Sequence, residues 1–249
     1  MTSVVQQDDR FAGRRVIVTG AASGIGASAV GRFAAEGAAV VAVDRDPARL
    51  EGRHGDTAGV TTFVADVRDD VLLELIAGGP PPDVLVNAAG VLRREPFVTH
   101  SLAAWDETLA VNVRSVFRTS RTFSARHIGE NTPGSIVNVC SIESFTAAPD
   151  HAAYTVSKSA VAMLTRAFAL ELADHDIRVN GIAPGVTATA MNEALREDAE
   201  RASRLRRSIP MGRFAEAAEQ AAAIAFLASD EASYITGAIL PVDGGWLTA

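Results

Sequence analysis

The sequence lacks several features that define whole classes of protein. Its 249 residues contain a single cysteine, Cys140, so no intrachain disulfide and no cysteine-based metal cage can form. The formal net charge is −7, and nucleic acids and anionic membranes both require a basic surface on their partners. The longest apolar runs, such as 221–228, are too short to span a bilayer. We therefore predict no metal site, no nucleic-acid partner and no membrane partner.

Targeting signals and internal boundaries are also missing. Residues 1–10 have no basic segment followed by an apolar core, so no signal peptide is predicted and the cytoplasm is the expected location. No repeat, low-complexity linker or composition break divides the chain. We expect one domain over 1–249, with 1–10 as a flexible N-terminus. The 48% of hydrophobic residues can form a substantial core.

Short β-branched runs alternate with longer segments of helical period. The predicted strands are 15–20, 39–44, 61–66, 83–90, 135–141, 177–185 and 238–245, and the predicted helices include 24–36, 102–127, 152–173, 191–207 and 215–229. This alternation indicates βαβ units, and hence a parallel sheet with helices on both faces. The strands are almost entirely apolar, as expected where both faces of a sheet are covered.

A glycine cluster lies between the first strand and the first helix. Gly20, Gly24 and Gly26 let the chain turn sharply and let a pyrophosphate approach the N–H groups at the helix start. Their spacing is Gly-x-x-x-Gly-x-Gly and not the usual Gly-x-Gly-x-x-Gly, so a simple strand–helix turn is the competing interpretation.

Polar residues at the ends of the next strands support a dinucleotide site. Asp44 ends the second strand, where a carboxylate accepts hydrogen bonds from ribose hydroxyls and repels a 2′-phosphate, so NAD is predicted over NADP. Arg45 could pair with such a phosphate, although a solvated arginine is the simpler interpretation. Asp66 and Asn87 end the third and fourth strands, at the edge where such sheets bind ligands. Asp66 could also cap the helix that follows it.

Tyr154 and Lys158 lie one turn apart on the predicted helix 152–173. A free tyrosine titrates near pH 10, and a neighbouring ammonium group lowers the pKa of the phenol, as a bound nicotinamide ring would. Such a phenol can take a proton from an alcohol or give one to a carbonyl oxygen. The alternative is an ordinary pair on the helix surface.

Ser141 and Asn112 extend this cluster. Ser141 ends the fifth strand, and its hydroxyl could share a substrate oxygen with Tyr154, or cap a turn. Asn112 interrupts an apolar helical pattern; it could connect through water to Lys158, or serve as a structural hydrogen bonder. Cys140 is most simply a buried strand residue.

Taken together, these motifs resemble the short-chain dehydrogenase/reductase family. The matching segments are TGAASGIG (19–26), NAAG (87–90), Asn112, Ser141, YTVSK (154–158) and PG (184–185), in the family's order. The resemblance implies a doubly wound, mostly parallel, seven-stranded sheet of Rossmann type in a three-layer sandwich. It also implies a nicotinamide cofactor and a homotetramer.

The resemblance implies a role for each matching residue. Tyr154 would be the acid/base, and Lys158 would lower the pKa of Tyr154 and hold the nicotinamide ribose. Ser141 would position the substrate oxygen. Asn112 would support a proton relay through water. The predicted cofactor contacts are Gly20, Ser23, Gly24, Ile25, Gly26, Asp44, Arg45, Asp66, Val67, Asn87, Ala88, Ala89, Gly90, Tyr154, Lys158, Pro184, Gly185, Val186, Thr187 and Thr189.

The expected substrate is a small secondary alcohol or its ketone, interconverted by hydride transfer. The segment AGVLRRE (89–95) resembles relatives that act on sugar acids or polyols, while the general pattern equally resembles 3-oxoacyl-thioester reductases. Arginines 201, 204, 206, 207 and 213 could form a lid for anionic substrates or simply be solvated. His151 could line the pocket or be a turn residue. A dinucleotide-binding sensor without turnover is the non-enzyme alternative, and a hydrolase is disfavoured because no Gly-x-Ser-x-Gly motif is present.

Overall fold

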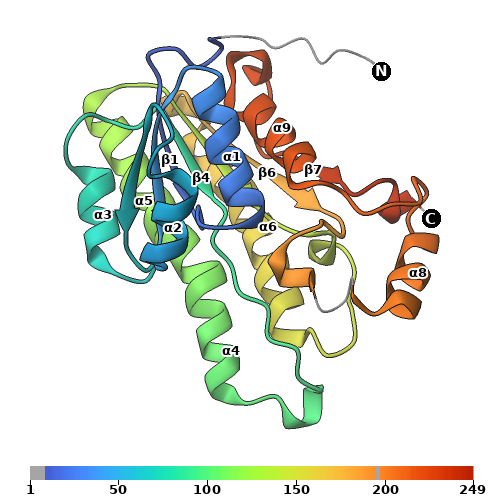
Figure 1. The fold of residues 1–249 in the computed structure, drawn as a ribbon. Coiled ribbons are helices and arrows are strands. Elements are labelled where there is room, and N and C mark those ends of the chain that lie inside the picture. The colour runs from blue at the N-terminus through green and yellow to red at the C-terminus, as the bar shows by residue number, and fades with distance from the viewer. Residues whose placement is uncertain (1–8, 194–196, 249) are drawn as a thin grey trace.

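The computed structural model describes residues 9–193 and 197–248, so most of the expected flexible segment 1–10 lies outside the described residues. Within them, the strands form one parallel sheet in the order β3-β2-β1-β4-β5-β6-β7 (Figure 1). The strands are β1 (Arg15–Thr19), β2 (Ala39–Asp44), β3 (Val60–Val64), β4 (Val84–Asn87), β5 (Gly134–Val139), β6 (Ile177–Pro184) and β7 (Ile239–Val242). The predicted Rossmann-type sheet is confirmed.

Helices cover both faces of the sheet. They are α1 (Gly24–Ala35), α2 (Pro47–His54), α3 (Asp70–Ala77), α4 (Leu102–Leu109), α5 (Ser115–Glu130), α6 (Ala152–Leu172), α8 (Ala199–Arg207) and α9 (Ala217–Ala228). One core cluster includes Phe33 of α1 and Ile224 of α9 and lies on one face of the sheet; a second includes Ile76 of α3 and Phe123 of α5 and lies on the other. The strands are mostly apolar because both clusters pack against them, which confirms the three-layer prediction.

The strand order places a switch point between β1 and β4. From β1 the chain continues through α1 to β2 on one side, whereas from β4 it continues through α4 and α5 to β5 on the other. The connecting loops therefore diverge at the carboxyl ends of β1 and β4. Open α/β sheets bind ligands in the crevice formed there.

The predicted helix 102–127 is divided in the structure. A π-helical turn over Ala110–Arg114 separates α4 from α5 and contains Asn112. The predicted helix 191–207 is a short 3-10 turn (Ala190–Asn192) followed by α8, with residues 194–196 outside the described part of the chain. Among the described helices, none is both long and apolar enough to cross a membrane.

Candidate active site

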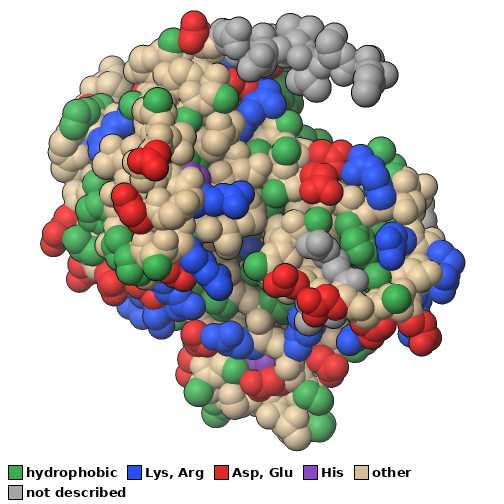
Figure 2. Space-filling model, viewed as in Figure 1, with side chains coloured by type: hydrophobic (Ala, Val, Ile, Leu, Met, Phe, Trp, Pro, Cys, Tyr) green, Lys and Arg blue, Asp and Glu red, His purple; other side chains and the backbone are tan. Residues whose placement is uncertain are grey.

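A cavity of about 570 Å³ lies at the carboxyl ends of the strands, at the switch point. Figure 2 shows the hollow between the main body and the lobe that carries α8, with basic side chains along its edge. Every predicted cofactor residue except Asn87 lines this cavity, as do the predicted catalytic residues Ser141, Tyr154 and Lys158. Asn112 does not line it.

The glycine loop forms one end of the cavity. Gly20 has φ +69°, and a Cβ on Gly26 would lie 2.2 Å from the Gly20 carbonyl oxygen, so only glycine fits this turn. α1 begins directly after the loop, and the Ser23 side chain does not cap it. The first N–H groups of a twelve-residue helix therefore face a cradle that any side chain would fill, and such a cradle fits a pyrophosphate.

Asp44 stands beside this loop at the end of β2. Its carboxylate accepts backbone hydrogen bonds from Ala22 and Asp46, both at 3.0 Å. Arg45 lies 3.8 Å from Asp66, and Asp66 also binds Arg68 at 2.7 Å, which lowers the pKa of the Asp66 carboxyl. The capping interpretation of Asp66 was wrong, because α3 begins later, after Asp69.

Two predicted polar residues lie behind the cavity wall. Asn87 is 5% exposed; its amide donates to Asn138 at 2.9 Å and to Ser120 at 3.2 Å, so it joins β4 to β5 and α5. Asn112 bonds the N–H and the carbonyl of Val91, at 2.8 and 2.9 Å, and donates to Ser157. Both side chains have the partners that buried amides require.

Gly90 separates Asn112 from Lys158. A Cβ on this glycine would lie 3.5 Å both from Oδ1 of Asn112 and from Nζ of Lys158. Both polar groups therefore border the same small volume. A side chain at residue 90 would fill that volume.

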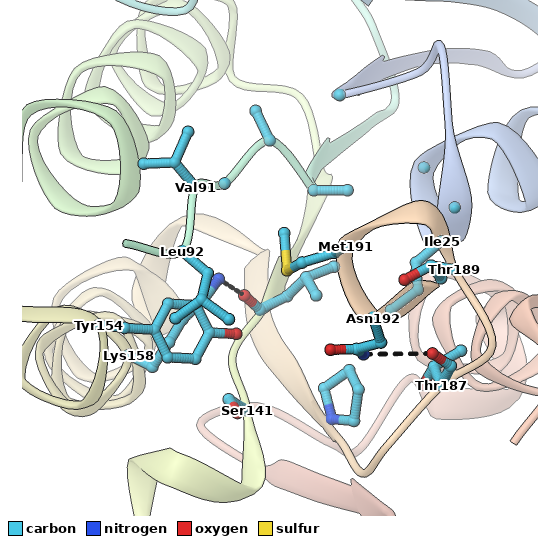
Figure 3. Close-up of a pocket in the computed structure, with 18 of the residues that line it drawn as sticks. Ile25, Val91, Leu92, Ser141, Tyr154, Lys158, Thr187, Thr189, Met191 and Asn192 are labelled. Atoms are coloured by element: carbon cyan, nitrogen blue, oxygen red, sulfur yellow. Dashed lines mark hydrogen bonds between the residues drawn. The ribbon is translucent and has the colours of Figure 1, made fainter. Parts of the chain in front are cut away.

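Ser141, Tyr154 and Lys158 converge on one wall of the cavity (Figure 3). Lys158 is 5% exposed, and its Nζ donates to the Val139 carbonyl at 2.7 Å and lies 5.8 Å from the centre of the Tyr154 ring. Because the lysine is buried, the pair is not a contact on the helix surface. Tyr154 is half-buried, and Ser141 lines the cavity beside it (Figure 3).

Burial dominates the ionisation of these groups. It raises the pKa of Tyr154 to about 12, with Glu143 and Cys140 adding to the effect and the Ser141 hydrogen bond opposing it. Burial also lowers the pKa of Lys158 to about 8. We expected Lys158 to lower the Tyr154 pKa, but with the protein groups alone that pKa is raised. The reason is that burial at this site disfavours a charge of either sign.

Cys140 lies directly after β5, beneath these groups. It is 1% exposed, and burial raises the pKa of its thiol to about 11. A thiol of this kind is protonated and unreactive at neutral pH, which agrees with the interpretation as a buried strand residue.

The far end of the cavity holds side chains that the sequence did not single out. Glu143, Met191, Asn192, Leu205 and Trp246 line it, together with Arg94. They come from segments far apart in the chain, including α8 and several short turns, and no short motif marks them. The pocket-lining interpretation of His151 agrees with the structure.

The arginines of segment 186–214 that were considered as a lid do not line the cavity. Arg204 pairs with Glu200 at 3.0 Å, Arg213 with Glu219 at 2.6 Å, and Arg206 lies over the ring of Phe214. None of the five arginines considered as a lid lines the cavity, whereas the apolar Leu205 of α8 does. The structure therefore favours the solvated interpretation for them.

A doubly wound sheet with a glycine cradle at its switch point defines the Rossmann class of nucleotide-binding proteins. A family model described as enoyl-(acyl carrier protein) reductase matches residues 20–247. L-xylulose reductase of Bos taurus is 42% identical over 241 residues, which cover 96% of this chain and 99% of that protein. The chain belongs to the short-chain dehydrogenase/reductase family of oxidoreductases.

Two further relatives are similar to this protein over nearly the whole chain. Gluconate 5-dehydrogenase of Gluconobacter oxydans (strain 621H) is 37% identical, over 94% of this chain and 95% of that protein. The crystal structure of a gluconate 5-dehydrogenase from Burkholderia cenocepacia, in complex with NADP and tartrate, is 33% identical with a TM-score of 0.89. It covers 97% of this chain and 98% of that one.

Proposed function

We propose that this protein interconverts a secondary alcohol and a ketone on a sugar, sugar acid or polyol, using a nicotinamide dinucleotide. The observation that carries the proposal is the convergence of Ser141, Tyr154 and Lys158 in the cavity whose other end is the glycine cradle. The relatives named for L-xylulose and gluconate support a sugar-like substrate. The dinucleotide would supply the hydride acceptor or donor beside these groups.

In this proposal Tyr154 exchanges a proton with the reacting oxygen. In the oxidative direction its phenolate oxygen accepts the hydroxyl proton; in reduction the phenol returns a proton to the carbonyl oxygen. Ser141 donates a hydrogen bond to the same oxygen, where negative charge develops. Lys158, as an ammonium group 5.8 Å from the centre of the ring, stabilises the phenolate once the proton has left.

We propose NAD as the preferred cofactor and NADP as the second candidate. Support for NAD comes from the Asp44 carboxylate, which lies in the cavity beside the glycine loop and would repel a 2′-phosphate. Support for NADP comes from Arg45 and Arg49, which line the same end, and from the NADP bound to the Burkholderia relative.

We also propose that the protein is a homotetramer. Apolar side chains stand exposed on α5 and α6, namely Phe117, Val156, Met163 and Leu170. Helix-on-helix packing between subunits would cover them. Light scattering on the purified protein tests the proposal, and a monomeric mass would reject it.

The function is tested by following NADH and NADPH absorbance over three substrate sets: sugar acids, polyols and their ketones, and 3-oxoacyl thioesters. Turnover in either of the first two sets is the expected result. Turnover of thioesters alone would favour the acyl-reductase alternative, and dinucleotide binding without turnover of any set would favour a sensor.

A further inference from the structure

Arg94, in the loop after β4, differs from the other arginines of the cavity. Arg45 and Arg49 line the cofactor end, where each faces an aspartate, Asp66 at 3.8 Å and Asp46 at 3.4 Å. Arg94 lines the opposite end, and no carboxylate oxygen of residues 9–193 or 197–248 lies within ion-pair distance of it. Its charge is therefore available to a ligand.

A chain of hydrogen bonds fixes the orientation of Arg94. Its Nε–H donates to Nε2 of His151 at 3.1 Å, and Nδ1 of His151 in turn donates to Glu143 at 2.8 Å. Thr155 donates to the second oxygen of Glu143 at 2.7 Å. Glu143 is thus occupied by two donors on the side away from Arg94. The guanidinium is held through its Nε edge, which leaves its terminal N–H groups for other acceptors.

The remaining contact of Arg94 is weak. One terminal nitrogen lies 3.5 Å from Oδ1 of Asn192, at the limit of a hydrogen bond. Asn192 follows the Pro184–Gly185 loop and donates to the Thr187 carbonyl at 3.3 Å, so it lies across the cavity from Tyr154 (Figure 3). A planar acceptor with two oxygens would fit the terminal N–H groups of Arg94 better than this amide does.

Arg94 also acts on the reacting end of the cavity. Its positive charge is among the influences that lower the pKa of Tyr154, against the larger effect of burial. His151, which accepts the hydrogen bond from Arg94, has its ring centroid 6.2 Å from that of Tyr154, so one small molecule can reach both Arg94 and Tyr154. A molecule with a hydroxyl at Tyr154 and a carboxylate a few carbons away would use both.

We propose that Arg94 binds the carboxylate of a polyhydroxy acid, so that the substrates are aldonates and their keto forms and not neutral polyols. The inference rests on the proposed function and names the substrate class of the same site. His151 acts as a positioning residue, because it accepts a hydrogen bond from Nε of Arg94 and is itself anchored on Glu143.

Matched substrates and matched variants test this proposal. We would measure kcat/KM with NAD and NADP for D-gluconate, D-galactonate and L-idonate, and for D-glucitol, galactitol and L-iditol, which carry CH₂OH in place of the carboxylate. The variant is Arg94→Met. The control is Arg93→Met, because the neighbouring Arg93 forms a two-pronged pair with Glu107 at 2.8–3.0 Å and does not line the cavity.

The wild type should prefer the aldonates, and R94M should lower the ratio of aldonate to alditol kcat/KM by about tenfold to a hundredfold, as expected for a lost charge-assisted hydrogen bond. R93M should leave that ratio unchanged. Arg94→Lys should restore part of it, because lysine keeps the charge but not the planar fork. A wild type that prefers alditols, or an R94M ratio equal to that of the wild type, would overturn the inference. Absence of turnover on every substrate by a folded wild type would instead reject the proposed function.

Discussion

The two ends of the cavity are built in different ways. At the cofactor end, the cradle for a pyrophosphate consists of backbone: the turn in which Gly20 and Gly26 approach closely, and the open first turn of α1. The substrate end consists of side chains, including Arg94, His151 and Asn192, which come from separate loops. A surface made of backbone tolerates no added atoms, whereas one made of side chains can change residue by residue. The comparison predicts that pyrophosphate binding is constrained by shape, whereas substrate choice and the preference for NAD or NADP depend on side-chain chemistry.

The two ends meet at Tyr154, and a change there gives the largest expected effect. Tyr154→Phe should lower kcat by about 10²–10⁴, because it removes the proton-transfer group, while the dissociation constant for the dinucleotide stays nearly the same. Steady-state kinetics and cofactor fluorescence titration measure the two quantities. The control is Tyr234→Phe, which changes the other tyrosine of the chain, on the surface. Turnover within a few-fold of wild type would reject the mechanism.

Adding a methyl group at Gly26 tests whether the glycine turn at the cofactor end tolerates a side chain. In Gly26→Ala the new Cβ would overlap the Gly20 carbonyl oxygen, so we expect a loss of about 1–3 kcal/mol in stability and about tenfold to a hundredfold in cofactor affinity. Gly31→Ala is the matched control in the same helix, because no atom lies within 4 Å of its Cβ position. That variant should be more stable than wild type by about 0.5–1 kcal/mol. Equal cofactor affinity in both variants would contradict the shape argument.

A substitution of Lys158 measures how much the buried charge, at the point where the two ends of the cavity meet, lowers the free energy of unfolding. The fall of the Lys158 pKa from 10.5 to about 8 means that burial of the charge destabilises the folded state by roughly 3 kcal/mol. The hydrogen bond to the Val139 carbonyl stabilises it by about 1 kcal/mol. Lys158→Met should therefore abolish turnover yet raise the free energy of unfolding by about 2 kcal/mol near pH 7.

The pH dependence of that gain follows from the lowered pKa. Below pH about 8 the lysine is charged in both states, and the penalty is fully present. Between about 8 and 10.5 the unfolded chain still binds the proton that the folded protein has released, so wild-type stability rises. The advantage of Lys158→Met should shrink over this interval in urea titrations. A constant difference would show that burial of the charge is not the cause.

The smallest predicted effect concerns cofactor choice. Asp44→Asn removes the charge and keeps an acceptor oxygen for one of the two backbone N–H groups of Ala22 and Asp46, so the NAD/NADP ratio of kcat/KM should fall by about tenfold. Asp66 lines the same end of the cavity, but Arg68 lies 2.7 Å from its carboxylate and already compensates the charge. The NAD/NADP ratio of the control variant Asp66→Asn should therefore change less. An unchanged ratio in Asp44→Asn would remove this carboxylate from the cofactor argument.

The sequence predicted the backbone end well because its chemistry is local. Gly20, Gly24 and Gly26 fall within seven residues, and a strand–glycine–helix pattern has few structural solutions. Asn87 was expected in the cavity; a residue at a strand end can face either way, and tertiary packing aims this one at Asn138. Arg94 could not be distinguished from Arg93, because one residue of offset in an irregular loop decides which one faces Glu107.

Lys158 is the only lysine in the sequence, and it is buried in the cavity wall. Side-chain amine chemistry therefore has one target in this protein, and the lowered pKa makes that amine a nucleophile under mild conditions. Acylation of this side chain, followed by mass spectrometry, would report whether the cavity is open or covered. The protein thus carries a built-in chemical probe of cofactor occupancy, usable before any substrate is known.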